Sequence, residues 1–211
     1  MVPTMSWRGA LDGQLELLDQ TRLPREVVQL ECRDVETVER AIRRLQVRGA
    51  PAIGVSAAFG VCLGVQPALD GTDASFFERL EYSVNLLAKS RPTAVNLFAG
   101  LRRVRSTALA LRGQRSPREI ASEMLREAQR MYDEDAAMCR AIGAHGARLL
   151  TDGMGLLTHC NAGGLATCGI GTALAVPITA HEEGQRLHVF VDETRPLLQG
   201  ARLTAWELLQ H

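Results

Sequence analysis

The sequence predicts an α/β protein: a small antiparallel sheet and a group of helices, followed by the opening of a doubly wound parallel sheet. Alternating apolar residues flank Asp12-Gly13, a dipeptide typical of a hairpin turn. Apolar residues then recur at helical spacing between residues 34 and 150. From residue 155 the order is strand, glycine-rich bend, helix, strand and helix, which is the βαβ order of a parallel sheet.

The composition indicates a globular protein with a sizeable core and no charge bias. Hydrophobic residues make up 46% of the 211 residues and charged residues 23%, a balance that is ordinary for a soluble domain. The formal net charge is zero. We therefore expect neither nucleic acid nor a membrane surface as a partner.

Cysteine usage favours a reduced, cytoplasmic protein. The five cysteines are scattered, odd in number and free of any CxxC pair, which favours neither a disulfide framework nor a zinc site, so we expect no metal. The N-terminus lacks the apolar core of a signal peptide. The low-charge run at residues 49–69 holds too many Gly and Pro residues for a convincing membrane span.

Local sequence signals predict the third strand and the first two helices. Residues 27–30 should add a third strand to the hairpin. Asp34 should cap the next helix, because its side chain can accept a hydrogen bond from a first-turn amide. A second helix should begin near Pro51, since proline costs nothing in a first turn.

The segment before Pro51 is the first candidate site. Arg48 and the free amides of Gly49 and Ala50 would stand at a helix N-terminus, where the helix dipole and a guanidinium both favour a phosphate. On spacing alone this signal is weak. A loop of small residues that permits tight packing explains it equally simply.

Two more helices should follow, over residues 75–89 and 94–111, the first opened by a capping box at residues 75–78. Arg91, which lies between them, is kept extended by the proline that follows it. Taken alone, it is an ordinary surface arginine.

A long helix should then run from Ser116-Pro117 to residue 150. Ser116 and Glu119 form a capping box, with proline at the first helical position. Gly143 and Gly146 are expected to bend or break this helix near its end.

Residues 155–174 form the most informative stretch: a short strand that ends at Cys160, a glycine-rich bend and a helix of small residues. Ligands of open α/β sheets bind at the carboxyl ends of the strands, so Cys160 is a candidate reactive thiol. Burial as a packing residue is an equally good explanation. His159 should point to the opposite face, which argues against a Cys/His dyad.

The second parallel strand should end at Asp192. Asp192 and Glu193 could serve as acid/base or substrate-orienting groups. They could equally form a structural ion pair with Arg202 or Arg48, and the structural role is favoured for Arg195. Gln199 lies in the first turns of the following helix, where its amide could reach a phosphate.

The chain divides into three predicted parts. Residues 1–115 form a β-hairpin and helical domain, and residues 116–150 form a linking helix. Residues 151–211 begin a Rossmann-like catalytic domain that is incomplete in this chain, because one βαβ unit cannot cover both faces of its strands.

Several of these stretches, taken in order, resemble the bacterial S-methyl-5-thioribose-1-phosphate isomerases, a family shared with the alpha, beta and delta subunits of the eukaryotic initiation factor 2 exchange factor. They are VRGAPAIG at residues 47–54, RPTAVNL at 91–97, LTHCNAG at 157–163, DETRP at 192–196 and QGARLTAWEL at 199–208, with a further match at residues 18–24.

The resemblance implies an aldose–ketose isomerase of methionine salvage that works on a sugar 1-phosphate, without a cofactor, as a homodimer. The substrate, chiefly its phosphate, would be held by Arg48, Gly49, Ala50, Arg91 and Gln199. Cys160 would be the catalytic cysteine, as a transition-state stabiliser or a proton-transfer group.

The resemblance also implies a catalytic aspartate on a later strand and an Asn-Lys pair, which residues 1–211 do not match. We expect the remainder of the same polypeptide, or a cleaved C-terminal piece, to supply them, and this chain alone to be inactive and poorly stable. Two rival functions remain: isomerisation of ribose 1,5-bisphosphate, and a non-catalytic regulatory role like that of the exchange-factor subunits. Cys160 and the full arginine set favour an isomerase.

Overall fold

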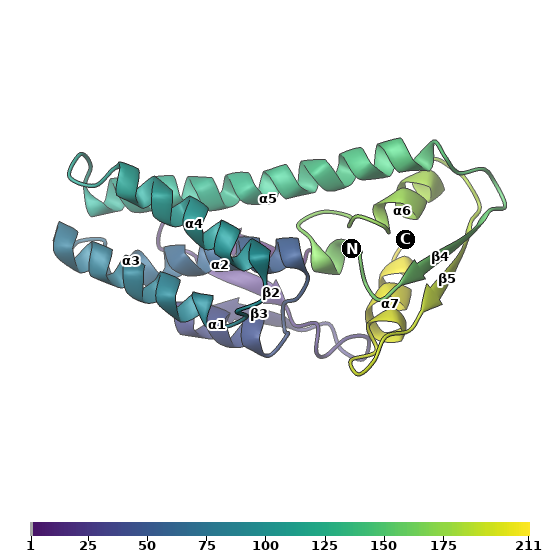
Figure 1. Ribbon diagram of the computed structural model, residues 1–211, viewed down its shortest axis with the longest axis horizontal. Coiled ribbons are helices and arrows are strands. Elements are labelled where there is room, and N and C mark those ends of the chain that lie inside the picture. The colour runs from purple at the N-terminus through teal and green to yellow at the C-terminus, as the bar shows by residue number, and fades with distance from the viewer. Residues whose placement is uncertain (1) are drawn as a thin grey trace.

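Three antiparallel strands open the chain: β1 (Met5–Arg8), β2 (Gln14–Leu18) and β3 (Gln29–Cys32), in that order in the sheet (Figure 1). The molecule is described by a computed structural model, which covers residues 2–211. The predicted hairpin is confirmed, with Arg8 opposite Gln14. The third strand begins two residues later than expected, and the exposed Val27 and Val28 lie before it.

The first two helices form as their sequence signals predict. In α1 (Val35–Arg43), the Asp34 side chain accepts a hydrogen bond of 2.6 Å from the amide of Thr37. Proline occupies the first turn of α2 (Ala50–Val65).

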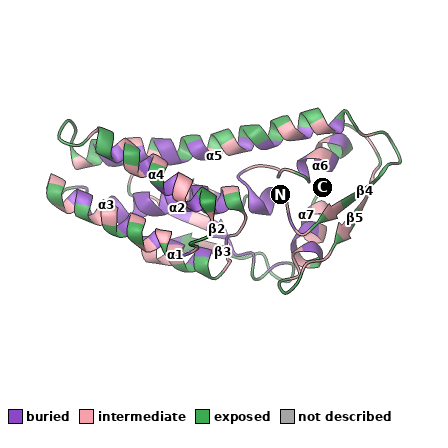
Figure 2. Cartoon of the chain, in the orientation of Figure 1, coloured by how far each residue is buried: buried purple, intermediate pink, exposed green. Residues whose placement is uncertain are grey.

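Helix α2 is the core of the helical region. Every residue from Ala52 to Val65 is buried, because α1, α3, α4 and α5 pack around it (Figure 2). The segment Ala50–Ala68 is long and apolar enough to cross a membrane, but 78% of its apolar window is buried inside the protein. A helix that is apolar on all sides and covered in this way is a core helix.

Helix α3 (Asp73–Ala88) begins two residues before Ser75, so the prediction of a capping box at residues 75–78 was wrong. Thr72 is the N-cap, and its hydroxyl oxygen accepts a hydrogen bond of 3.2 Å from the amide of Ser75. Ser75 thus lies inside the first turn. Helix α4 (Val95–Ala110) matches the expected span.

Helix α5 (Pro117–Ala147) runs unbroken for 31 residues, against the expectation that its glycines would bend or break it. Gly143 and Gly146 face α6 (Ala175–Glu182). A β-carbon at Gly143 would collide with Thr179, and one at Gly146 with Val176. These glycines permit two helices to approach closely, and neighbouring contacts keep the helix straight.

The predicted capping box of α5 is present, with Ser116 and Glu119 satisfying each other's backbone groups. Replacing Ser116 by alanine should therefore lower the free energy of unfolding by about 1 kcal/mol, measured by urea denaturation. Ser106→Ala, at an exposed position inside α4, is the matched control and should leave stability unchanged or slightly higher. Equal stability of Ser116→Ala and the wild type would contradict this role of the cap.

Strands β4 (Gly155–His159) and β5 (His188–Asp192) form the predicted parallel pair, with His159 opposite Asp192. The helix expected directly after the bend was placed too early, since α6 begins only at Ala175. Residues 164–166 form a single 3-10 turn, and Gly163 pairs with Gly171. Gly171 has a φ of 97°, a left-handed conformation that glycine adopts readily and that is incompatible with a helix at this position.

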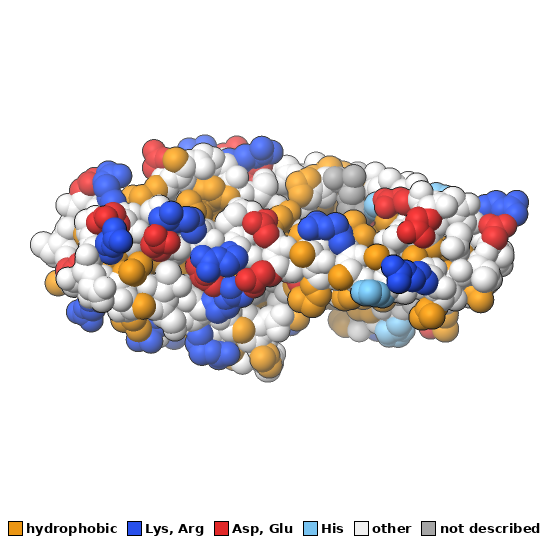
Figure 3. Space-filling view, turned by 90° about the horizontal axis from the view of Figure 1, so that it is seen from above, with side chains coloured by type: hydrophobic (Ala, Val, Ile, Leu, Met, Phe, Trp, Pro, Cys, Tyr) orange, Lys and Arg blue, Asp and Glu red, His pale blue; other side chains and the backbone are white. Residues whose placement is uncertain are grey.

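The chain then forms a π-helical turn, Gly200–Thr204, and α7 (Ala205–Leu208). Helix α5 runs along most of the length of the molecule, contacting α2 and α4 toward one end and α6 toward the other (Figure 1). The expected mixed α/β fold, with a small antiparallel sheet, a helical region and a two-stranded parallel sheet, is confirmed. Basic and acidic side chains alternate over the face shown in Figure 3, without a large area of one sign.

Candidate functional site

One cavity, of about 410 Å³, is lined by the five residues expected to hold a phosphate. They come from three separate segments: the turn that leads into α2, the loop between α3 and α4, and the turn before residue 200. The five are Arg48, Gly49, Ala50, Arg91 and Gln199. The fold therefore gathers at one place residues that lie up to 151 positions apart in the sequence (from 48 to 199).

Gly49 permits the tight backbone turn that lines this cavity and leads into α2. Its φ of 94° lies in the left-handed region, and a β-carbon there would collide with Ala166. Glycine is the residue that tolerates both conditions. The turn brings Arg48 and the unpaired first-turn amides of α2 to the same cavity wall, where the positive end of the helix dipole favours an anion.

A second cavity, of about 460 Å³, adjoins the first and shares Leu45, Arg48, Leu197 and Gln199 with it. Five arginines line this second cavity and no acidic residue does; the arginines are Arg22, Arg25, Arg44, Arg48 and Arg202. The two cavities therefore adjoin each other and together form an arginine-rich cleft.

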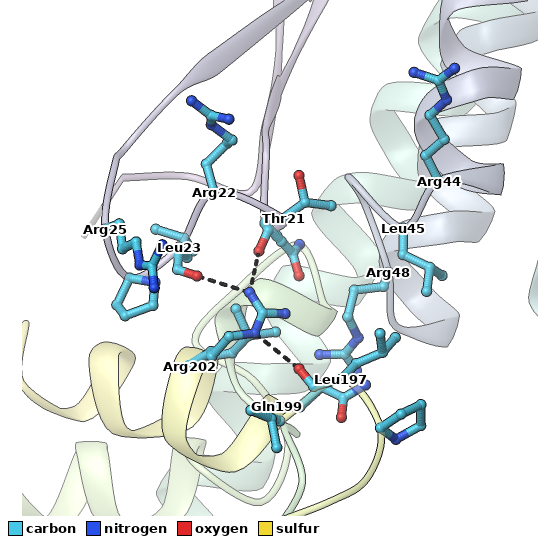
Figure 4. Close-up of a pocket in the computed structure, with 15 residues that line it drawn as sticks. Thr21, Arg22, Leu23, Arg25, Arg44, Leu45, Arg48, Leu197, Gln199 and Arg202 are labelled. Atoms are coloured by element: carbon cyan, nitrogen blue, oxygen red, sulfur yellow. Dashed lines mark hydrogen bonds between the residues drawn. The ribbon is translucent and has the colours of Figure 1, made fainter.

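Figure 4 shows Arg48 and Arg202 turned into this cleft, while Arg22 and Arg44 point away from it. Arg202 donates hydrogen bonds to the backbone carbonyls of Leu197, at 2.9 Å, and Leu23, at 2.8 Å. These carbonyls hold its guanidinium in place, and no carboxylate within residues 2–211 forms an ion pair with it.

Arg48 is half-buried, and its guanidinium hydrogen-bonds to a single residue among residues 2–211, Asn161. Its Nη1 donates to the side-chain Oδ1 at 2.7 Å, and its Nη2 donates to the backbone carbonyl at 3.3 Å. Burial lowers the pKa of Arg48, while the nearby Cys160 and Glu207 act in the opposite direction. Because a guanidinium keeps its proton at neutral pH, Arg48 stays charged and available to an anion.

Cys160 stands at the carboxyl end of β4, in a left-handed conformation with a φ of 60°. The turn is held at both sides: its amide donates to the carbonyl of Asp192 at 3.3 Å, and its carbonyl accepts from the Thr204 hydroxyl at 2.5 Å. Cys160 does not line either cavity. It adjoins them through Asn161, the next residue, which contacts Arg48.

Exposure distinguishes Cys160 from the other thiols. It is half-exposed, whereas Cys32, Cys62, Cys139 and Cys168 are buried. Burial raises the pKa of Cys32 and of Cys62 to about 12. Because the thiolate is the reactive form, these buried thiols are poor candidates for chemistry.

The carboxylates of Asp192, at the end of β5, and Glu193, directly after it, have a structural role. Glu193 accepts hydrogen bonds from the amides of Thr194, Gly200 and Ala201, which also lower its pKa. Within residues 2–211, neither Glu193 nor Asp192 forms an ion pair with an arginine, so the ion-pair alternative was wrong. Asp192 instead lies 3.9 Å from His159.

Gln199, the last of the residues predicted to bind the phosphate, is oriented by a hydrogen bond to the same segment. Its side-chain oxygen accepts a hydrogen bond of 2.7 Å from the Thr194 hydroxyl. The amide nitrogen is thereby left to face the cavity that Gln199 lines.

Three polar residues beneath the cavity had no role in the sequence analysis: Asn161, Thr204 and Glu207. All three are buried, and they are hydrogen-bonded to one another through Asn161. Glu207 could have been identified from the sequence, because it is a glutamate between Trp206 and Leu208 in an otherwise apolar helical segment.

Comparison with known proteins finds similar sequences and similar structures. The Initiation factor 2 subunit family matches over residues 46–211. A methylthioribose-1-phosphate isomerase of Trichlorobacter lovleyi is 52% identical over 208 residues, which cover 98% of this chain and 59% of that protein. A 5-deoxyribose 1-phosphate isomerase of Moorella thermoacetica is also 52% identical, over 99% of this chain and 58% of that protein. The chain thus spans about three-fifths of the length of these relatives.

Two solved structures have the same fold. A protein described as subunit delta of translation initiation factor eIF-2B, from A. fulgidus, superposes with a TM-score of 0.89 at 43% identity, over all of this chain and 60% of that one. The 5-methylthioribose 1-phosphate isomerase of Pyrococcus horikoshii superposes with a TM-score of 0.90 at 36% identity, over 99% of this chain and 57% of that one.

Proposed function

This chain belongs to the Initiation factor 2 subunit family, and on that premise we propose that the complete protein is an aldose–ketose isomerase. Its substrate would be S-methyl-5-thioribose 1-phosphate and its product the corresponding ribulose 1-phosphate, in methionine salvage. The names of the relatives in Trichlorobacter lovleyi and Pyrococcus horikoshii support this assignment.

One observation carries the proposal: Arg48, Gly49, Ala50, Arg91 and Gln199 line a single cavity, and Cys160 adjoins it through Asn161. Two guanidinium groups and a helix N-terminus suit the two negative charges of a phosphate monoester. A purely regulatory subunit has no need for a thiol held beside such a cavity.

The proposed chemistry is an internal transfer of hydrogen. A sugar 1-phosphate is a closed ring, so the bond between C1 and the ring oxygen must first break, with a proton going to that oxygen. A hydrogen then moves from C2 to C1 while the C2 hydroxyl loses its proton and becomes a carbonyl. Arg48 and Arg91 would fix the phosphate on C1, and Cys160 would stabilise the charge or carry a proton at the reacting carbons.

A second candidate substrate is 5-deoxyribose 1-phosphate, which the name of the Moorella thermoacetica relative favours. The two sugars differ only in the substituent at C5. Both proposals therefore use the same phosphate cavity and the same reaction.

Steady-state kinetics of the complete protein with three substrates tests the function. We expect the highest kcat/KM with methylthioribose 1-phosphate, a lower value with 5-deoxyribose 1-phosphate and none with ribose 1,5-bisphosphate. Turnover of none of the three would overturn the enzyme assignment, and a preference for the bisphosphate would overturn the substrate.

Arg91→Ala should raise KM for the phosphorylated sugar by about 10- to 100-fold and change kcat less. The variant removes one charge-assisted contact to the phosphate, worth about 1.5–3 kcal/mol. Arg102→Ala, an exposed position on α4 that lines neither cavity, is the matched control. An unchanged KM in Arg91→Ala would remove Arg91 from the site.

A further inference from the structure

Glu207, on α7, is the most deeply buried carboxyl group among residues 2–211, with no exposed surface. It lines neither cavity. Burying a carboxylate is costly unless hydrogen bonds and charges compensate for the lost water, so its surroundings need an explanation.

Both carboxylate oxygens face hydrogen-bond donors. Oε1 accepts from the backbone amide of Leu165 at 2.9 Å, and Oε2 accepts from Nδ2 of Asn161 at 2.5 Å. Burial raises the pKa of Glu207, while these donors and the charge of Arg48 act to lower it. Gly163 lies so close to the carboxylate that a β-carbon would collide with its oxygens. The pocket around Glu207 is thus shaped for an acceptor at both positions.

This arrangement decides which way the Asn161 amide points. The carboxylate can only accept, so the amide nitrogen must face Glu207. The amide oxygen then faces Arg48, whose Nη1 donates to it at 2.7 Å. If the amide were reversed, two donors would meet at Arg48, and the guanidinium would keep only its longer hydrogen bond, of 3.3 Å, to the backbone carbonyl of Asn161.

A second branch of the same network reaches Cys160. Nδ2 of Asn161 also contacts the Thr204 hydroxyl at 3.1 Å, and that hydroxyl donates to the carbonyl of Cys160. The left-handed conformation of Cys160 is thereby tied to the same buried group.

We propose that Glu207 is a positioning residue of the site: through Asn161 it fixes the guanidinium of Arg48 at the phosphate cavity and braces the turn that carries Cys160. The identity of the substrate rests on the proposed function. The positioning of Arg48 does not, because it concerns the binding of any phosphate group in this cavity.

The test begins with Glu207→Gln in the complete protein. Glutamine keeps the size of the side chain but presents a donor to Leu165 or to Asn161, which favours reversal of the Asn161 amide. The Kd for inorganic phosphate, measured by calorimetry, should rise at least about 10-fold, the loss expected for one misdirected hydrogen bond to a charged group. KM for the sugar phosphate should rise in parallel.

A second variant, Glu207→Gln with Asn161→Asp, should restore part of the binding. The carboxylate then lies at position 161, where one oxygen accepts from Arg48 and the other from the new amide at 207. Phosphate affinity should stay below that of the wild type, because the new carboxylate lies against Arg48. The matched comparison is Asn161→Asp alone, which places two carboxylates against each other. Tighter phosphate binding by the double variant than by Asn161→Asp supports the proposal, and equal or weaker binding overturns it, whether or not Glu207→Gln alone folds.

Glu127→Gln is the matched control. Glu127 is also buried, but it binds Arg103 on the far helices α4 and α5, at 2.7 Å. Its loss should lower Tm and leave phosphate affinity unchanged. The inference is overturned if Glu207→Gln behaves in the same way, with wild-type phosphate affinity and KM. A wild-type protein that binds phosphate but turns over no sugar phosphate would contradict the proposed function alone.

Discussion

Cys160→Ser is expected to fold normally and to lower kcat by about 10²- to 10⁴-fold, the range for loss of a group that transfers or stabilises a proton in the transition state. A serine hydroxyl keeps the size and the half-exposed position of the thiol but ionises far less readily. KM should change little, because Cys160 lines neither cavity.

The matched control for this prediction is Cys32→Ala. Cys32 is buried at the end of β3, so its replacement should lower stability and leave kcat unchanged. Rates would be measured on both variants at saturating substrate, with thermal unfolding recorded in parallel. A wild-type kcat in Cys160→Ser would reduce Cys160 to a packing residue.

Arg48→Ala is expected to lower kcat/KM by about 10²- to 10⁴-fold. Arg48 can present two donors to a phosphate, each worth about 1.5–3 kcal/mol as a charge-assisted hydrogen bond. Its loss also leaves the side-chain oxygen of Asn161 without its partner and removes a positive charge that lowers the pKa of Glu207. Stability should therefore fall together with activity.

Arg48→Lys separates charge from geometry at the same position. Lysine keeps the charge but cannot make a two-point contact, so kcat/KM should lie between those of wild type and Arg48→Ala. Equal activity of Arg48→Ala and the wild type would show that the phosphate does not bind in this cavity.

Local signals in the sequence predicted most of the helices and strands. Asp34 and the Ser116–Glu119 capping box mark helix starts that the structure confirms, because each cap satisfies amides within its own first turn. The start of α3 was missed because two capping residues, Thr72 and Ser75, lie three positions apart, and only one of them can be the N-cap.

The glycines were harder to interpret. Gly143 and Gly146 were expected to weaken α5, but they admit α6 against it, and that contact is invisible before the two helices are placed side by side. Similarly, the small residues after Gly163 looked helical, yet the pairing of Gly163 with Gly171 holds that segment as a loop.

At the candidate site, the residues expected to bind phosphate could be identified from sequence motifs. The buried residues that hold Arg48 in place, Asn161 and Glu207, could not. Arg48 meets Asn161 across 113 positions of sequence, and Asn161 meets Glu207 across 46. No local pattern links such distant segments. The assignment of these residues to substrate binding and catalysis stays a prediction until the variants are measured.

The most direct test of the account is ¹³C NMR of the complete protein incubated with methylthioribose 1-phosphate labelled at C2. The account predicts that the C2 signal moves to the position of a ketone carbonyl with wild-type protein and does so at least 100-fold more slowly with Cys160→Ser and Arg48→Ala. A C2 signal that stays that of a closed sugar ring with the wild type, or that moves equally fast with all three proteins, would contradict it.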